Sequence, residues 1–242
     1  MKNLDFNSDK ILCELEFLKD DKELIGLGKA CLEAHQEKEL EILKSKFKPN
    51  PKASYEVSWE ALESILRSGE RVHGIRTERH ISNVIVFNLS MVKGSLSDHR
   101  ISELRKKLDR VASDRIRDIF QMKNELLIFN SGHFWYPPGG YMGWHTNFKV
   151  PGWRLYISYA QEPGRSFFRY RDPKSSEIVT VWDDGWNFRL FKIDPHRPLW
   201  HAVYSETNRF SFGYNINLKP TPRFSDRLME KAKQVLARAG AF

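Results

Sequence analysis

Two histidines in the second half of the chain have neighbours that favour metal binding. His145 is followed two residues later by Asn147, and His201 lies in the apolar segment 199–204, Leu-Trp-His-Ala-Val-Tyr. Side chains in a strand repeat every two residues, so an extended chain places His145 and Asn147 on one face. An imidazole within an apolar strand needs a polar partner or a metal ion. We therefore take these three side chains as candidate metal ligands.

A cation and a hydroxyl follow on the next predicted strand. Arg209 comes eight residues after His201, and Ser211 shares its face of the strand. A guanidinium binds a carboxylate through two parallel hydrogen bonds, and a serine hydroxyl can donate another. Two histidines and one oxygen ligand form the facial set of non-haem iron oxygenases, which leaves coordination positions open. The pattern predicts an iron site beside a carboxylate-binding pocket.

The order of these residues resembles the catalytic core of the iron(II)/2-oxoglutarate-dependent oxygenases, from about residue 126 to 217. In that family a Tyr-x-x-Gly segment and a His-x-Asp segment are followed by His-x-Val and then by Arg-x-Ser. Here the four elements are Tyr136 to Gly139, His145 to Asn147, His201 to Val203, and Arg209 to Ser211. The resemblance implies a double-stranded β-helix, with Fe(II) and 2-oxoglutarate as cofactors and O2 as a cosubstrate.

The resemblance also assigns roles to individual residues. The iron ligands would be His145, His201 and Asn147, and the 5-carboxylate of 2-oxoglutarate would bind Arg209 and Ser211. A tyrosine on the strand after the His-x-Asp segment often contacts the cosubstrate in this family. Tyr156 and Tyr159 are the candidates, and because they face opposite sides of the strand only one can serve. Candidate substrate contacts are Tyr136, Trp144 and Arg154.

Two features depart from the family pattern. The acid of His-x-Asp is replaced by Asn147, whose amide oxygen can ligate iron but brings no negative charge, so iron should bind more weakly. The gap between His201 and Arg209 is short and needs a tight hairpin at 205–208, Ser-Glu-Thr-Asn. The alternatives are a non-catalytic β-helix binding module with a degenerate metal site, and a halogenase, in which chloride takes the place of the acid.

The region that holds these residues has the texture of an all-β core. Short segments rich in Ile, Val, Tyr, Phe and Trp, separated by Pro and Gly, replace long helical patterns after Met122. The expected strands are 125–130, 153–160, 165–170, 177–182, 187–193, 199–204 and 209–216. Asp183-Asp184-Gly185 has the composition of a hairpin turn and is not interpreted as a catalytic carboxylate pair. Many short strands at near-regular spacing indicate a barrel or sandwich.

Helical periodicity dominates the rest of the chain. Helices are expected at 20–46, at 59–66 with Ser58 as N-cap and Gly69 beyond the end, at 95–120 and at 225–238, with one strand at 84–87. The predicted fold class is α+β, in one integrated domain. Its parts are a mainly helical region 1–122, the β-helix core 123–218 and a C-terminal helix 219–242. The polar loop 72–79 is expected near the substrate entrance.

Composition bounds the partners. No apolar run approaches the roughly 18 residues of a membrane span, which predicts a cytoplasmic protein without a membrane partner. The net charge of +8 permits nucleic-acid binding, but Lys and Arg are dispersed, which favours a small-molecule or peptide substrate. Six of the seven tryptophans lie between Trp135 and Trp200, which suits either a large β core or an aromatic-lined cavity.

Overall fold

Two antiparallel sheets form the core of the computed structural model, which describes residues 4–38, 45, 47–69, 81–88, 99–122 and 124–219. The first sheet has the order β1 (Leu12–Glu14), β9 (Trp186–Ile193), β6 (Gly152–Ala160), β11 (Arg209–Leu218), β4 (Leu126–Tyr136) and β3 (Ile85–Asn88). The second has the order β2 (Ser82–Asn83), β5 (Gly140–His145), β10 (His201–Ser205), β7 (Ser166–Arg171) and β8 (Ile178–Trp182).

The chain crosses between the two sheets at almost every step from β4 to β11. Only β7 and β8 follow one another within the same sheet. Successive strands of a simple meander would instead pair with each other. This alternation is the topology of a double-stranded β-helix, and the predicted core with flanking helices is confirmed.

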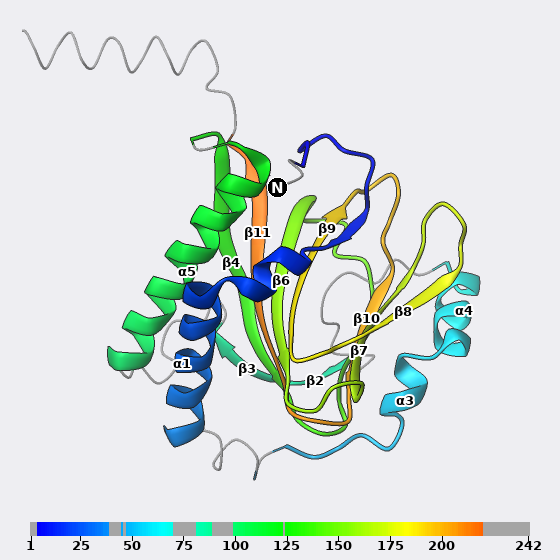
Figure 1. Cartoon of the computed structure of the whole chain (residues 1–242). Helices are drawn as coiled ribbons and strands as arrows, with labels where there is room; N and C mark the ends of the chain where they lie inside the picture. The colour runs from blue at the N-terminus through cyan, green and yellow to red at the C-terminus, as the bar shows by residue number, and fades with distance from the viewer. Residues whose placement is uncertain are drawn as a thin grey trace, which may run out of the picture.

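Side chains alternate strictly along β11 between the outer face of the first sheet and the barrel interior. Phe210, Phe212, Tyr214 and Ile216 are buried on the outer face of the first sheet, so the intervening residues face the barrel interior. Helices α1 (Lys22–Lys38) and α5 (His99–Phe120) lie side by side over that outer face (Figure 1). Burial of each large side chain there contributes about 1.5–3 kcal/mol, which makes this layer the main apolar core.

A smaller apolar layer covers the second sheet. Leu62 and Ile65 of α4 (Trp59–Arg67) pack with Tyr141, Phe167 and neighbouring residues, and the short helix α3 (Ala53–Glu56) precedes α4. The Ser58 hydroxyl accepts a hydrogen bond from the Ala61 amide at 3.2 Å, so the predicted N-cap is confirmed. Helices therefore flank the barrel on both sides (Figure 1).

Between the sheets lies a third, mixed cluster. Phe191 and Tyr136 from the first sheet meet Met142, Phe168 and Val203 from the second. These side chains line the inside of the barrel and form its apolar walls. Among the tryptophans, Trp135, Trp153 and Trp186 belong to the outer helix-covered layer, Trp144 and Trp200 pack in the α3–α4 layer, and Trp182 is exposed. Five of these six tryptophans thus build the two outer apolar layers, and none belongs to the cluster between the sheets.

Several local predictions need correction. The expected hairpins at 183–185 and 205–208 are wrong, because each connection joins strands of different sheets. Turn composition signals a tight reversal but does not say which sheet the next strand enters. The sequence predictions also missed β1, β2 and β5 and cut β4 short. The predicted helix 225–238, the loop 72–79 and the start of the helix 95–120 lie outside the described residues.

No helix among the described residues is long and apolar enough to cross a membrane.

Candidate active site

His145 and His201 face each other across two paired strands. They are register partners between β5 and β10, and their ring centroids lie 4.1 Å apart. The pairing slips by one residue beside them, so that Gly143 and Trp144 together oppose Ala202, as in a β-bulge. A Cβ on Gly143 would lie 3.1 Å from the backbone oxygen of Glu56, which favours glycine at this crowded position. The bulge turns His145 into the barrel.

Backbone carbonyls fix the tautomer of both rings. Nδ1 of His145 lies 2.8 Å from the Gly143 oxygen, and Nδ1 of His201 lies 2.9 Å from the Leu199 oxygen. Because a carbonyl can only accept, each Nδ1 carries the hydrogen and the lone pair is on Nε2. Burial, followed by the neighbouring His145, holds the pKa of His201 well below its usual range. His201 is therefore a neutral imidazole suited to metal ligation.

Asn147 lies beside the histidine pair, but strand alternation, the predicted reason, does not place it there. Strand β5 ends at His145, and Asn147 has a φ of +53°, so strand alternation does not bring it to the site. Asparagine is among the residues that tolerate this left-handed conformation. Its Nδ2 lies 3.4 Å from Nε2 of His201. Half a turn of the amide would present Oδ1 to the space beside the two rings.

The donor set fits a divalent metal with one weak ligand. Within the described part of the chain, no group of three or more His, Cys, Asp and Glu side chains is placed to hold a metal ion. Two imidazole nitrogens and one amide oxygen are acceptable ligands for iron(II), but the set lacks the usual anionic member. If a metal binds here, Asn147 is the described side chain positioned to complete the facial set.

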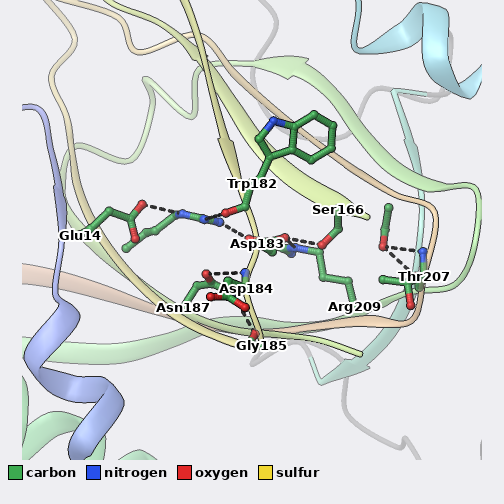
Figure 2. A network of polar contacts seen from close by, with 11 residues as sticks. Glu14, Ser166, Trp182, Asp183, Asp184, Gly185, Asn187, Thr207 and Arg209 are labelled. Carbon is green, nitrogen blue, oxygen red and sulfur yellow. Dashed lines mark hydrogen bonds and ion pairs between the residues drawn. The ribbon is translucent and has the colours of Figure 1, made fainter. Parts of the chain in front are cut away.

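Arg209 lies at the opposite end of the barrel, beside the connection from β10 to β11. Its Nε donates to Asp183 Oδ2 at 2.8 Å, and Asp183 also accepts from Ser166 Oγ at 2.5 Å and from Arg189 Nη1. Arg189 Nε in turn donates to Glu14 Oε1 at 2.7 Å. Figure 2 shows Asp183 in the middle of this network, with Glu14 on one side and Ser166 and Arg209 on the other.

The network balances its own charge. Burial alone would raise the pKa of Asp183, but Arg209 and Arg189 hold it at about 2, so the carboxylate is charged at neutral pH. Only the Nε of Arg209 takes part. Its two terminal nitrogens make no hydrogen bond to any residue that the structure describes, and its guanidinium carbon lies 5.1 Å from the centre of the Tyr136 ring. A further carboxylate can therefore approach Arg209.

Ser211 continues the inner wall next to Arg209. It is 3% exposed and pairs in register with Ser158 of β6. The Ser158 hydroxyl is buried and finds no hydrogen-bond partner among the described residues. Buried hydroxyls are normally satisfied, so the interior beside Ser211 has polar groups to offer a ligand.

The two candidate tyrosines lie on opposite faces, as predicted. Tyr156 faces the interior, where its ring meets Phe191 edge to face at 4.9 Å, and burial raises its pKa. Tyr159 faces outward and packs on Trp186 at 5.1 Å. Tyr156 is therefore the one of the pair that can meet a ligand inside the barrel.

The three predicted substrate contacts do not all face the barrel interior. Trp144 is corrected: its ring packs in the α3–α4 layer, and its Nε1 donates to the Ser58 oxygen at 2.7 Å, because the bulge turns it away from the interior. Tyr136 and Arg154 do face the interior, at opposite ends of the barrel. A cavity of about 290 Å³ is lined in part by Thr146 and Phe148, the chain neighbours of Asn147, together with His196, Pro198 and Trp200.

The counter-ion Asp183 was missed, since sequence analysis assigned it to a turn. The available signal was the pair of arginines on inward positions of predicted strands, at 189 and 209, which require an acidic partner once buried.

No protein-family model matches the chain, and no curated protein matches it by sequence. Among solved structures, the chain is similar to a 2OG-Fe(II) oxygenase family oxidoreductase from Burkholderia pseudomallei, with 12% identity and a TM-score of 0.41. That match covers 56% of this chain and 65% of the other, which is less than two thirds of its length.

Two further matches are a Pseudomonas putida prolyl-4-hydroxylase and a Trichoplax adhaerens prolyl hydroxylase in complex with a peptide fragment. They have 11% and 13% identity, and both have a TM-score of 0.39. They cover 72% and 69% of this chain, and 89% and 79% of the others. Likeness at this level carries no argument about activity, which has to come from the site.

Proposed function

We propose that the chain is an iron(II)- and 2-oxoglutarate-dependent oxygenase. The observation that carries the proposal is the facing pair His145 and His201, each with its Nδ1 bound to a backbone carbonyl and its lone pair on Nε2. The interior arginine and the motif order support it.

Five residues have a defined role in this proposal. His145, His201 and the Asn147 amide oxygen hold the metal, while Arg209 and Ser211 bind the 5-carboxylate of 2-oxoglutarate. When bound, the cofactors supply an oxidation in which O2 and 2-oxoglutarate yield succinate and CO2 while a substrate C–H bond is hydroxylated.

The chain's own contribution is orientation and shielding. The Leu199 and Gly143 carbonyls fix the imidazole planes, and Asp183 holds Arg209 by its Nε, which leaves the terminal nitrogens for a carboxylate. Phe168 and Phe191 stand 5.6 and 5.3 Å from the His201 ring and exclude water from its sides. A small organic molecule or a peptide is the substrate class that we favour, and a cytoplasmic location remains a prediction.

The test combines metal binding with turnover. Iron(II) affinity and 2-oxoglutarate-dependent succinate formation should both fall at least tenfold in His145→Ala and in His201→Ala. His99→Ala is the matched control, because His99 is exposed on α5, and it should behave as the parent protein. Unchanged iron affinity in both site variants would refute the metal assignment.

One observation favours a second candidate, a binding module that does not turn over. The metal set of the described residues has no carboxylate, so it should hold iron less tightly than two histidines and an acid would. A module of this kind would bind 2-oxoglutarate through Arg209 but form no succinate at saturating iron. Chloride-dependent product formation would instead indicate halogenation.

A further inference from the structure

Three arginines occupy inward-facing positions of the first sheet, and only two of them pair with a carboxylate of the described residues. Arg189 and Arg209 both pair with Asp183, and Arg189 also pairs with Glu14. Arg154 of β6 is 3% exposed, and no carboxylate of the described residues pairs with it. It is thus the one of the three whose charge is not balanced by the described chain.

The contacts of Arg154 satisfy part of its hydrogen bonding but none of its charge. Its Nη1 donates to the Trp153 oxygen at 2.9 Å and its Nη2 to the Val150 oxygen. A guanidinium has five N–H donors, so three remain. Carbonyl groups are neutral, and a buried cation without an anion is unfavourable. Arg169, on the outer face of β7, also donates to a carbonyl, but that residue is only partly buried, so water can solvate its charge.

A second unsatisfied group lies opposite Arg154. Asn215 is its register partner on β11 and shares its face, which places their Cβ atoms about 5 Å apart. Asn215 is 7% exposed, its Oδ1 is fully buried, and its side chain makes no hydrogen bond to any described residue. Buried amides are normally satisfied. A cation without a counter-charge therefore lies beside an amide that makes no hydrogen bond within the described part of the chain.

Arg154 and Asn215 lie at the other end of the barrel from Arg209. Arg154 is near the start of β6, which follows the end of β5 where His145 lies, whereas Arg209 lies where β10 is joined to β11. On the neighbouring strand β9, Phe191 is the register partner of Arg154, and its ring lies 5.3 Å from His201 and 4.9 Å from Tyr156. A ligand held by Arg154 would extend along these rings to the histidine pair.

We propose that Arg154 and Asn215 form a carboxylate-binding site for the substrate, and that the substrate is a small organic acid with an apolar or aromatic body. The carboxylate takes the remaining Arg154 donors and the Asn215 amide NH₂, and the body lies against Phe191 and Tyr156. As a statement about a substrate, this inference rests on the proposed function. As a statement about an anion site, it does not.

The test uses metal-free protein and a matched pair of probes, 3-phenylpropanoate and its neutral analogue 3-phenylpropanamide. Calorimetry should show the acid binding at least tenfold more tightly than the amide. Arg154→Gln should abolish that preference, Arg154→Lys should keep part of it, and the control Arg169→Gln should leave it unchanged. An equal affinity for acid and amide in the parent protein overturns the proposal.

A second variant guards against a purely structural role of Arg154. Asn215→Asp places a carboxylate opposite the guanidinium, so it should raise the melting temperature while abolishing binding of 3-phenylpropanoate. If Arg154 serves only to hold the Val150 carbonyl, Arg154→Gln will lower the melting temperature and leave the acid preference intact, which also overturns the proposal.

A third arm separates substrate from cosubstrate. The affinity of the metal-free protein for 2-oxoglutarate should fall in Arg209→Gln and stay within about twofold in Arg154→Gln. The opposite result would make Arg154 the cosubstrate anchor and overturn the substrate assignment. Arg154-dependent binding of the acid in a protein that forms no succinate with iron would leave the anion site standing while the proposed oxygenase function fails.

Discussion

Removing the charge of Asp183 tests whether the buried network at the Arg209 end of the barrel stabilises the fold. Asp183→Asn is nearly isosteric, but it leaves Arg209 without a counter-charge and Arg189 with Glu14 alone. Breaking a buried pair by removing one partner costs about 3–5 kcal/mol. The pKa gives an independent figure: a fall from 3.8 to about 2 corresponds to about 2.5 kcal/mol, at ~1.4 kcal/mol for each tenfold change in proton affinity. We expect a loss of about 3 kcal/mol.

Urea unfolding at pH 7, followed by tryptophan fluorescence, measures this loss. The matched control is Asp184→Asn, because Asp184 is adjacent in sequence but exposed, and its unfolding free energy should change by less than about 0.5 kcal/mol. Adding Arg209→Gln to Asp183→Asn should be less destabilising than the sum of the two single changes, since one unpaired charge disappears. If Asp183→Asn is as stable as the control, the buried network does not stabilise the fold as argued.

The network also predicts an acid dependence. The pKa of Asp183 is depressed on folding, so its contribution is complete above the unfolded value near 3.8 and is lost as the pH falls through about 2. In Asp183→Asn the unfolding free energy should fall less steeply over this pH range than in the parent protein, because Asp21 and Asp194, whose pKa values are also lowered, still contribute.

Three other perturbations follow from the structure. Asn147→Asp should bind iron(II) more tightly, because a carboxylate replaces a neutral amide, and equal iron affinities in the parent, Asn147→Asp and Asn147→Ala would show that residue 147 is no ligand. Arg209→Lys should weaken 2-oxoglutarate binding by about tenfold, since a lysine cannot form the two-pronged contact, and an unchanged dissociation constant would rule out this anchor. Burial, with Arg105 and His35 nearby, lowers the pKa of His133 to about 3, so the unfolding free energy should fall between about pH 6.5 and 3, and a His133→Phe protein that keeps the same slope would contradict this.

The strand pattern predicted a barrel or sandwich, and the resemblance in motif order implied the β-helix and the pairing of His145 with His201. Alternating apolar residues identified β6, β7, β9 and β11, and the facing of Tyr156 against Tyr159 followed from the same rule. Strand β5 was missed because its glycines suppress the strand signal, and the bulge at Gly143 breaks the two-residue repeat. The position of Asn147 depends on one left-handed residue, which no periodicity encodes.

The sequence predictions also missed the ion pairs between residues that are far apart in the chain. Asp183 has turn-forming neighbours, and its partners come from two different strands. The same holds for Arg154, whose significance lies in the absence of an acid near it in the described structure. Charge balance in a core is a property of the assembled fold, so it becomes visible only when all strands are in place.

The ion pair between Glu14 and Arg189 has a consequence for the order of folding. The two residues are 175 positions apart in the chain, and β1 can pair only with β9 once that strand has been made. At a synthesis rate of about 5–20 residues per second, Leu12 to Glu14 leave the ribosome roughly 10 to 35 seconds before their partner strand. During that interval the β1 segment, with Cys13 and Glu14, has no partner strand to pair with. The Arg209 end of the barrel is consequently among the last regions to close, and an early N-terminal segment completes the charge balance of a strand that is made later.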